Sequence, residues 1–487
     1  MIWHCEDHKA NRLVAFCPKA YADMVHRSFF EEPEVFRREC VNPWEAHAAL
    51  QQLLPTEIKI QCKWAFRKRK GRRVLLPRAF LLAKRKKGWR KGRPVISYQG
   101  FFLHTLHRVV GRAITFMLHD VAQENSFNTP TTWSAVKQLA NISKQLQQEQ
   151  ETQLGNPDCD IQIHNDDLAG FFLTPPQARL ESDVQWLVER YCRQHARTPL
   201  DRAYLTVSAG LPLPTEGYVR RGWLPGCGGH RLPVKLILPV VQHSFHASIF
   251  TVVNTVVRQI RGAFISSPLS PPLCNNTVTR SEFEFLVTLN HRRLGWGAAR
   301  YVDNRICITR VQSGLPSVPA AVLTENFYGE PILLEPEPDT NYLGTMVTAK
   351  CGQLQMEFVV YAFNEILQST RQCDSDPECE PVLNERWRYR SEFTDARTQR
   401  CSVDCLLHGA VRLSFPTSLA QLAVLKAFAT LLYMQYDRQI LEVALSKHSK
   451  RFAATYTADM RRTLLSAIQC GGKDGTQQLL KVIRHHQ

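Results

Sequence analysis

The stretch IQIHNDDLAGFF, residues 161–172, combines a strand pattern with two adjacent acids. Ile161 and Ile163 alternate with polar residues, which is typical of a half-buried strand. The pattern ends in Asp166 and Asp167, and an apolar turn follows directly. Adjacent carboxylates are unfavourable unless a positive charge lies close by. Because the stretch contains no lysine or arginine, it favours a metal ion as the neutralising charge.

A second acid-bearing unit, ARYVDNRICIT (299–309), predicts a strand, a turn at Asp303 and a returning strand. Two carboxylates at adjacent strand ends can hold two divalent cations about 3.5–4 Å apart, which clamp the attacking and leaving oxygens in phosphoryl transfer. Two or three acids are enough for Mg²⁺, because substrate phosphates complete its coordination shell. The two units together predict a phosphoryl-transfer site built on Asp167 and Asp303.

The 487-residue chain is 44% hydrophobic and carries a formal net charge of +17, with a basic run between Lys63 and Arg93. This run holds fifteen lysines and arginines and no acid. A solvated face or a localisation signal would be the plainer explanation. Apolar residues interleave with the charges, however, so we expect a folded patch that binds a polyphosphate backbone. The densest cluster, RKRKGRR (67–73), is expected to contact the template strand.

The sequence predicts an intracellular protein, nuclear or cytoplasmic, with no membrane partner. The most apolar run (232–257) is interrupted by Lys235, His243 and His246. We therefore expect a buried helix over 238–259 rather than a membrane span. The N-terminus lacks a signal-peptide pattern, and the fifteen irregularly spaced cysteines are expected to be reduced thiols.

Two short cysteine-histidine groups offer possible zinc ligands. They are Cys401, Cys405 and His408 in CSVDCLLH, and Cys227 and His230 in CGGH. Neither group supplies four ligands with the spacing of a structural zinc site. Buried free thiols are therefore the favoured interpretation.

Hydrophobic periodicity predicts a basic hairpin at 76–97 and helices at 101–122, 132–153 and 175–195. Helical patterns dominate from Gln353 onward.

The order of the motifs resembles that of reverse transcriptases. They are RPVIS (93–97), DDLAGFF (166–172), SSPLSPPLCN (266–275), RYVDN (300–304) and NYLG (341–344). The third motif is closest in style to Penelope-like and related non-LTR retroelements. The resemblance implies an α+β fold, namely a right-hand polymerase with fingers, a palm with an antiparallel sheet, and a helical thumb. It divides the chain into an N-terminal extension (1–54), basic fingers (55–158), a palm (159–349) and a helical thumb or C-terminal region (350–487).

The resemblance assigns Asp167 and Asp303 as the catalytic aspartates that bind two Mg²⁺ or Mn²⁺ ions, with the carbonyl of Leu168 as a further ligand. Tyr301 precedes the second aspartate, as in the family's Tyr-x-Asp-Asp turn. Asn304 stands where the family has the last aspartate of that turn. Its amide oxygen can still approach a cation or accept hydrogen bonds.

The resemblance also implies contacts to the nucleotide and the primer. Lys84 and Arg93 match the lysine and arginine that hold the triphosphate. Phe172 matches the aromatic residue that lies under the sugar and helps to exclude a 2′-hydroxyl. The remaining assignments are the Ser-Pro pair of the third motif and the primer-grip turn of the last, namely Ser267, Pro268, Leu343 and Gly344.

Three departures from the family pattern bear on activity. Asn304 replaces an acid, and Ser266 replaces a glycine, which would be strained if that position requires a positive φ. Residues 311–349 contain no lysine, arginine or histidine, although the family often has a lysine there that protonates the pyrophosphate.

The function that the resemblance implies is RNA-directed DNA polymerisation, a nucleotidyl transfer. Its partners would be an RNA template, a DNA primer and deoxynucleoside triphosphates. Two alternatives remain open at the level of sequence. One is a domesticated or degenerate reverse-transcriptase-like protein that binds RNA or DNA without polymerising, and the other is a maturase-like RNA-binding factor.

Overall fold

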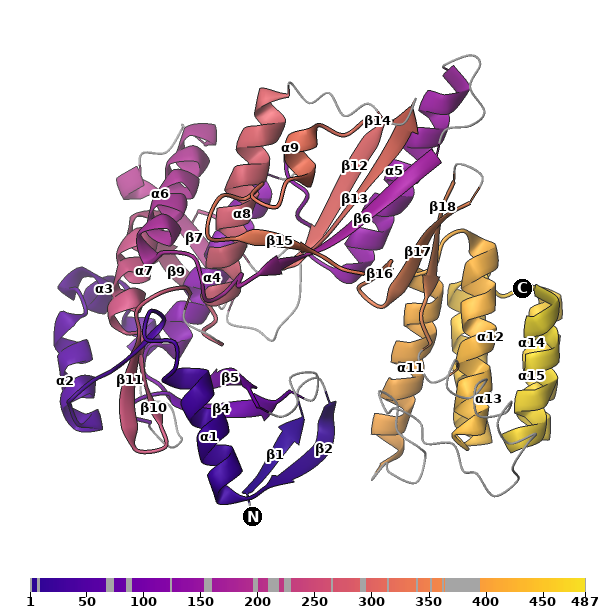
Figure 1. Cartoon of the computed structure of the whole chain (residues 1–487), viewed down its shortest axis with the longest axis horizontal. Helices are drawn as coiled ribbons and strands as arrows, with labels where there is room; N and C mark the ends of the chain where they lie inside the picture. Colours follow the sequence, from indigo (N-terminus) through magenta and orange to yellow (C-terminus); the bar gives the residue numbers. More distant parts are fainter. Residues whose placement is uncertain are drawn as a thin grey trace. The chain divides into compact units, whose positions relative to one another are not determined.

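The computed structural model divides into two compact units of mixed helix and sheet (Figure 1). Unit 1 comprises Met1–Asn128, Leu168–Arg292 and Thr324–Glu335, and unit 2 comprises Thr129–Asp167, Arg293–Leu323 and Pro336–Gln487. The residues described are 2–6, 9–66, 74–84, 90–122, 125–152, 160–195, 200–208, 219–222, 229–263, 266–289, 295–312, 315–338, 340–350, 353–360, 363 and 395–486.

Unit 1 is built on a seven-stranded sheet with the order β2-β1-β4-β10-β11-β3, in which β5 also pairs with β4. The strands are β1 (Ile2–Glu6), β2 (Lys9–Phe16), β3 (Phe36–Arg38), β4 (Arg78–Ala83), β5 (Gly92–Ser97), β10 (Ile249–Val252) and β11 (Thr255–Gln259). A smaller sheet, β8-β7-β9, contains β7 (Tyr204–Ser208), β8 (Val219–Arg221) and β9 (Gly229–Pro233).

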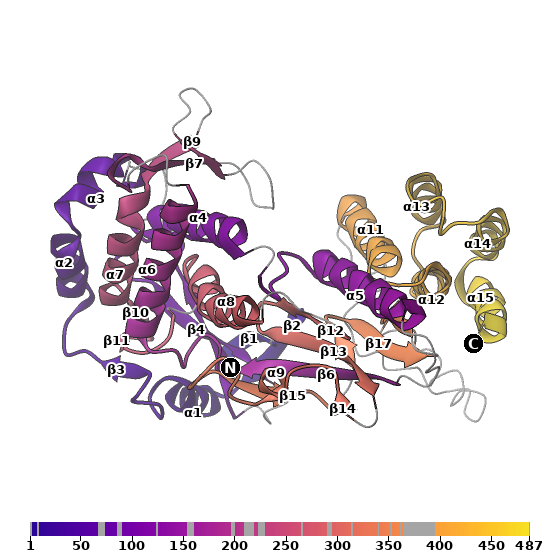
Figure 2. The ribbon, with the colours of Figure 1, turned by 90° about the horizontal axis from the view of Figure 1, so that it is seen from above.

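Four helices of unit 1 pack against one another, as Figure 2 shows. They are α4 (His104–Ala122), α6 (Gln177–Gln194), α7 (Ile237–His246) and α8 (Ser270–Thr288). The unit also contains α1 (Pro18–Phe29), α2 (Pro43–Leu53), α3 (Thr56–Gln61) and the 3₁₀ turns Lys63–Phe66, Leu200–Arg202 and Val234–Leu236. Strand β15 (Leu333–Pro336) ends at the boundary between the units.

Unit 2 contains the acid-bearing strands. β12 (Trp296–Tyr301), β13 (Asn304–Gln312) and β6 (Asp160–Ala169) are neighbours in one sheet, and β14 (Leu315–Pro316) pairs with β13. The last two residues of β6 belong to unit 1. A second sheet has the order β16-β17-β18, with strands Asn341–Tyr342, Thr345–Lys350 and Gln353–Phe358. Helix α5 (Thr132–Thr152) lies along β12, and α9 (Ala320–Leu323) is short (Figure 1).

One hydrophobic core joins α5 to both sheets of unit 2. Ile306 and Ile308 of β13 are fully buried in it, together with Leu139 of α5 and Val347 of β17. These two isoleucines lie on one face of β13, because alternate residues of a strand point to the same side. The opposite face of β13 therefore carries Arg305, which is also buried.

The C-terminal part of unit 2 is a set of helices around a core of its own. The helices are α11 (Ala396–Arg412), α12 (Thr417–Tyr433), α13 (Arg438–Arg451), α14 (Ala458–Cys470) and α15 (Gly472–His486). In three of them the side chain of the residue just before the helix accepts a hydrogen bond from a backbone N–H of the first turn. These residues are Asp395 for α11, Asp437 for α13 and Thr457 for α14. Such caps satisfy backbone N–H groups that have no partner within the helix.

The sequence predicted several of these elements. The hairpin of β4 and β5, the helices α4, α5 and α6, and the strand–turn–strand unit of β12 and β13 are confirmed. The buried helix predicted over 238–259 is wrong in its second half, because α7 ends at His246 and the chain continues as the hairpin of β10 and β11. The run IFTVVNTVV is dominated by β-branched residues, which favour strand over helix.

Two further sequence predictions concern the whole chain. No described helix combines the length and the apolar character that crossing a bilayer requires. The described cysteines are free thiols. The expectation that they are buried is wrong for Cys401 and Cys405, which lie on the exposed side of α11.

A comparison of two glycines tests how tightly unit 1 is packed. Gly262 and Gly222 have nearly the same positive φ, +76° and +77°, but only Gly262 is crowded. A Cβ at Gly262 would lie 2.4 Å from the carbonyl oxygen of Phe172, whereas a Cβ at Gly222 would have no atom within 4 Å. Gly222→Ala should lower the free energy of unfolding by about 1–2 kcal/mol, the cost of the left-handed conformation.

Gly262→Ala should add about 1–3 kcal/mol to that loss, because the backbone of Phe172 must move. Urea denaturation of both variants beside the wild type measures the difference. Equal losses for the two variants would show that the contact at Gly262 is not tight.

Candidate active site

The register of β6 and β13 brings the predicted catalytic residues of unit 2 together. The strands are antiparallel, and Asp167 lies directly opposite Asn304. Directly opposite Cα atoms in such a ladder are about 4.5–5.5 Å apart. Asp303 precedes Asn304 in the turn between β12 and β13, so both aspartates lie at one end of the sheet. All three side chains are half-buried.

The turn that carries Asp303 is strained. Tyr301 pairs with Asn304, so Val302 and Asp303 form a two-residue hairpin loop. Val302 has φ +58°, a conformation that a β-branched residue rarely adopts. The guanidinium of the buried Arg300 donates a hydrogen bond of 2.8 Å to the carbonyl oxygen of Val302. Such strain persists only where neighbouring contacts hold it, and it concentrates at functional sites.

The strained positions coincide with the sequence motifs. Among the described residues, five non-glycine residues have a positive φ: Val253, Ser266, Val302, Leu343 and Gln435. Three of these five lie in turns of the motifs singled out above, namely Ser266, Val302 and Leu343. Strain at all three turns therefore supports a functional role independently of the motif pattern.

Asn304 is directed at the carboxylate of Asp303. Its amide Nδ2 donates a hydrogen bond of 2.9 Å to Oδ1 of Asp303. Among the described residues no ion pair is formed with Asp303. The carboxylate therefore keeps oxygen lone pairs for a further ligand, and its contact within the turn is with a neutral group.

Asp166 has a different partner from Asp167, because adjacent residues of a strand point to opposite faces. It lies opposite Arg305 in the register. Nη2 and Nε of Arg305 donate to the same carboxylate oxygen at 2.7 and 3.1 Å, and Nη1 donates to the carbonyl oxygen of Val322 at 2.7 Å. Both side chains of this ion pair are buried. Asp166 is thus neutralised by an arginine from the neighbouring strand.

The NYLG motif forms a tight hairpin next to this end of the sheet. β16 and β17 are joined by Leu343 and Gly344, which have φ of +54° and +78°. Two consecutive positive φ angles are typical of a type I′ turn. Tyr342 is buried in the core of unit 2, and its hydroxyl lies 3.5 Å from the carbonyl oxygen of Asn304. The predicted primer-grip turn is therefore anchored beside the Asp303 turn.

In unit 1 the structure brings Phe172 next to Gly262, which lies four residues before the Ser-Pro motif. The N–H of Ala263 donates to the carbonyl oxygen of Phe172 at 2.9 Å, and the N–H of Gly262 donates to that of Pro175 at 2.9 Å. Phe172 is half-buried and packs edge-on against Phe171, with ring centroids 4.8 Å apart. These contacts hold the segment after β6 against the start of the motif.

The Ser-Pro turn itself packs on α4. A Cβ at Gly111 of α4 would lie 2.5 Å from the carbonyl oxygen of Pro268, so glycine allows the close approach. Ser267 is buried, and its hydroxyl accepts a hydrogen bond from the N–H of Leu269 at 3.3 Å, just before α8. Ser266 is exposed and has φ +61°. The position that is glycine in the family pattern does adopt a positive φ here.

The predicted triphosphate contacts lie on the basic hairpin of unit 1. Arg93 is exposed on β5 and lies opposite Leu82 of β4. Lys84 is half-buried and follows directly after the end of β4. The cluster at 67–73 lies outside the described residues.

Sequence reasoning missed the two buried arginines beside the site, Arg300 and Arg305. Both flank Asp303 within three residues, and arginine is seldom fully buried unless paired. Their positions on strands of alternating apolar residues were the available signal. The pairing of Arg305 with Asp166 could not be predicted, because the two residues lie 139 positions apart in the chain.

Among the described residues, no group of three or more histidines, cysteines and acids is arranged to hold a metal ion. For the zinc groups considered above, this includes Cys401, Cys405 and His408, while Cys227 lies outside the described residues. At the end of β6 and β13 the carboxylates of Asp167 and Asp303 belong to neighbouring positions, and the carbonyl of Leu168 follows Asp167. These are hard oxygen ligands, which suit Mg²⁺ when substrate phosphates supply the rest.

Comparison with solved structures shows which known fold this chain shares. The structure is similar to apo telomerase from Candida tropicalis, with a TM-score of 0.51 and 11% identity over 100% of this chain and 74% of that one. Telomerase is a reverse-transcriptase-related polymerase. The chain has a reverse-transcriptase-like polymerase fold. Telomerase from Candida albicans, in complex with the TWJ fragment of telomeric RNA, also matches at 13% identity over 96% of this chain and 65% of that one.

The TM-score of this second match, 0.44, is too low to add to the argument. No family model matches the sequence. No curated protein matches it either.

The buried ion pair of unit 2 can be tested separately from the predicted catalytic acids. Arg305→Met should lower the free energy of unfolding by about 3–5 kcal/mol, because it leaves the carboxylate of Asp166 buried without a cation. The double variant Asp166→Leu/Arg305→Met should recover most of this loss. Chemical denaturation of the three proteins gives the comparison. A single variant as stable as the wild type would show that the pair does not hold the strands together.

Proposed function

We propose that the chain is an RNA-directed DNA polymerase that adds nucleotides to a primer 3′ end. The observation that carries the proposal is the register of β6 and β13, which sets Asp167 opposite Asn304 and beside Asp303. The reverse-transcriptase-like fold supports it, as does the strain at the motif turns. Fingers, palm and thumb would correspond to the regions inferred from the motifs. A closer kinship with Penelope-like or non-LTR elements remains a prediction.

Asp167 and Asp303 would hold two Mg²⁺ or Mn²⁺ ions together with the carbonyl of Leu168. When bound, such ions neutralise phosphate charge and lower the energy of the in-line displacement. The protein's own contribution is to hold both carboxylates at one sheet end. The Val302 turn, fixed by Arg300, sets the direction of Asp303.

Other residues would position the reactants. Arg93 and Lys84 supply positive charge for the triphosphate, and the arginine fork suits two phosphate oxygens at once. Phe172 would lie under the sugar, and the Leu343–Gly344 turn would support the primer end. Positioning of this kind lowers the activation barrier, because the bound reactants have already lost the translational and rotational freedom that the reaction would otherwise remove. The partners would be RNA template, DNA primer and deoxynucleoside triphosphates.

A second function is favoured by Asn304. Its amide donates to Asp303, so one carboxylate oxygen is already hydrogen-bonded and the usual second acid is missing. A chain of this fold that binds RNA or DNA without copying it would have little need for that acid. A maturase-like RNA-binding factor belongs to the same class. In both alternatives the basic surface would bind nucleic acid, and the chain would not catalyse polymerisation.

The catalytic acids are tested by primer extension on an RNA template with Mg²⁺ or Mn²⁺. Asp167→Ala and Asp303→Ala should each reduce extension by about a thousandfold or more, because losing a metal ligand removes several kcal/mol of transition-state stabilisation. Template affinity should change little, since it depends on phosphate contacts elsewhere.

Asn304→Asp is the matched control, because it restores the usual acid and should keep or raise activity. Extension that survives loss of either aspartate would overturn the assignment. A wild-type protein that binds template but never extends a primer would favour the binding function.

The basic hairpin separates nucleotide binding from template binding. Arg93→Gln should raise the KM for nucleotide by about thirtyfold or more, corresponding to loss of a charge-assisted contact worth about 2–4 kcal/mol. Affinity for RNA should stay close to that of the wild type. Arg78→Gln, an equal change of charge at an exposed position of β4, serves as the control. If Arg93→Gln loses RNA affinity without a change in KM, the hairpin is a nucleic-acid clamp instead.

A further inference from the structure

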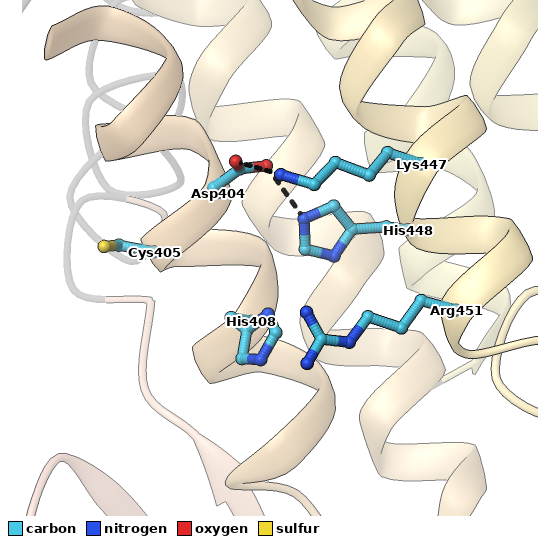
Figure 3. A pocket seen from close by; sticks show the side chains of 6 residues that line it. All are labelled: Asp404, Cys405, His408, Lys447, His448 and Arg451. Carbon is cyan, nitrogen blue, oxygen red and sulfur yellow. Dashed lines mark hydrogen bonds and ion pairs between the residues drawn. The ribbon is translucent and has the colours of Figure 1, made fainter. Parts of the chain in front are cut away.

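A cleft of about 380 Å³ lies between α11 and α13, and none of its lining residues was discussed above for catalysis. Figure 3 shows three lining side chains from each helix. They are Asp404, Cys405 and His408 from α11, and Lys447, His448 and Arg451 from α13. His408 and Arg451 point toward one another, whereas Cys405 turns away from the other five (Figure 3).

Asp404, the one carboxylate among the described residues that line the cleft, is already engaged. Asp404 accepts from Nζ of Lys447 at 2.5 Å and lies 3.1 Å from Nε2 of His448. Burial acts to raise the pKa of Asp404, yet these hydrogen bonds and the charge of Lys447 hold it below its usual range. Asp404 therefore remains ionised, and it has no free capacity to neutralise Arg451.

Two arginines approach one aromatic ring at the end of α13. Arg451 and Arg412 lie 5.5 and 5.9 Å from the ring centroid of Phe452, and neither forms an ion pair with any described residue. Burial, and then the charge of Arg451, lower the pKa of Arg412. Because the charge of Arg451 disfavours the charged form of Arg412, the two arginines define a site of positive potential.

His448 leaves a buried acceptor unpaired. Only 2% of its side chain is exposed, and its Nδ1 has no hydrogen-bond partner in the part of the chain that the structure describes. Because a carboxylate can only accept, Nε2 must carry the proton that faces Asp404, and Nδ1 of the neutral ring is a bare lone pair. Nδ1 lies on the side of the ring that faces Arg451 (Figure 3). A proton on this atom would become a further donor into the cleft.

We propose that the cleft between α11 and α13 is a binding site for a phosphate group. Arg451 would grip two of its oxygens through the guanidinium fork, with His408 and Lys447 as additional donors. The bound anion would stabilise a proton on His448 at Nδ1, so that this histidine bridges Asp404 and the ligand. The phosphate could belong to a nucleic-acid backbone or to a free phosphomonoester.

The proposal makes affinity depend on pH. The pKa of His408 is lowered to about 4 by burial and then by Arg412, Arg451 and His448, with Asp404 opposing them. That of His448 is lowered by burial, while Asp404 raises it and Lys447 and Arg451 lower it further. Both rings are therefore neutral at pH 7 in the empty site. An anion raises both pKa values, so binding takes up protons and strengthens as the pH falls.

Sulfate is a suitable first probe, because its charge is constant over the range in which histidine titrates. Calorimetry on the full chain at low salt should show binding about tenfold tighter at about pH 5.5 than at about pH 7.5, because the bound state holds an extra proton. His408→Gln should reduce this pH dependence. Arg451→Gln should weaken binding about tenfold or more at both pH values, as expected for loss of a charge-assisted pair.

Arg462→Gln on α14 is the matched control, because it removes the same charge from a residue whose side chain is 79% exposed. It should leave sulfate binding unchanged. Equal weakening by Arg451→Gln and Arg462→Gln would overturn the proposal by revealing general attraction to a basic protein, as would a lack of binding at both pH values. If Arg451→Gln does not fold, Arg451→Lys keeps the charge but loses the fork, and should still weaken binding.

A short single-stranded RNA without terminal phosphates identifies the source of the ligand. Competition with sulfate assigns the cleft to a nucleic-acid backbone, and lack of competition assigns it to a free phosphate or phosphomonoester. The site uses neither Asp167 nor Asp303. Sulfate binding and primer extension can therefore fail independently of one another.

Discussion

The buried ion pair between Asp166 and Arg305 fixes the register on which the candidate active site depends. A shift of one residue between β6 and β13 would move every side chain of the strand to the other face. It would leave Arg305 buried without its carboxylate and would turn Asp167 away from Asn304. Because an unpaired buried charge is far more costly than a paired one, only the observed register is stable. Asp166, which is paired with Arg305, thereby positions Asp167, the acid proposed to act in catalysis.

Backbone strain is the second constraint that shapes the site. Val302, Ser266 and Leu343 adopt conformations that cost of the order of 1–3 kcal/mol each in an L-residue. Val302 is held by a hydrogen bond from Arg300, and Leu343 by the neighbouring glycine and the buried Tyr342. Holding three such turns requires well-packed surroundings, and the core shared by α5, β13 and β17 supplies them for two of the three.

The sequence allowed prediction of elements whose signal is local. Periodicity defined α4, α5 and α6, and the basic hairpin and the NYLG turn followed from short patterns. The hairpin of β10 and β11 was mistaken for a helix because an apolar run gives no period that separates the two structures. The partner of Asp166 could not be predicted, since it depends on strand pairing across 139 positions. The sequence predicted strain at Ser266 only if that position requires a positive φ. Its φ of +61° meets this requirement.

The partner of each acid separates a structural role from a chemical one. Asp166 is matched by a full positive charge from the protein, so a cation from solution would gain little there. Asp303 receives a hydrogen bond from the neutral amide of Asn304, which orients the carboxylate without cancelling its charge. The turn can therefore fold with no cation bound, whereas an aspartate at 304 would set two like charges side by side. With Asn304 the turn therefore needs no metal ion to fold. The negative charge of Asp303 stays available to bind a cation.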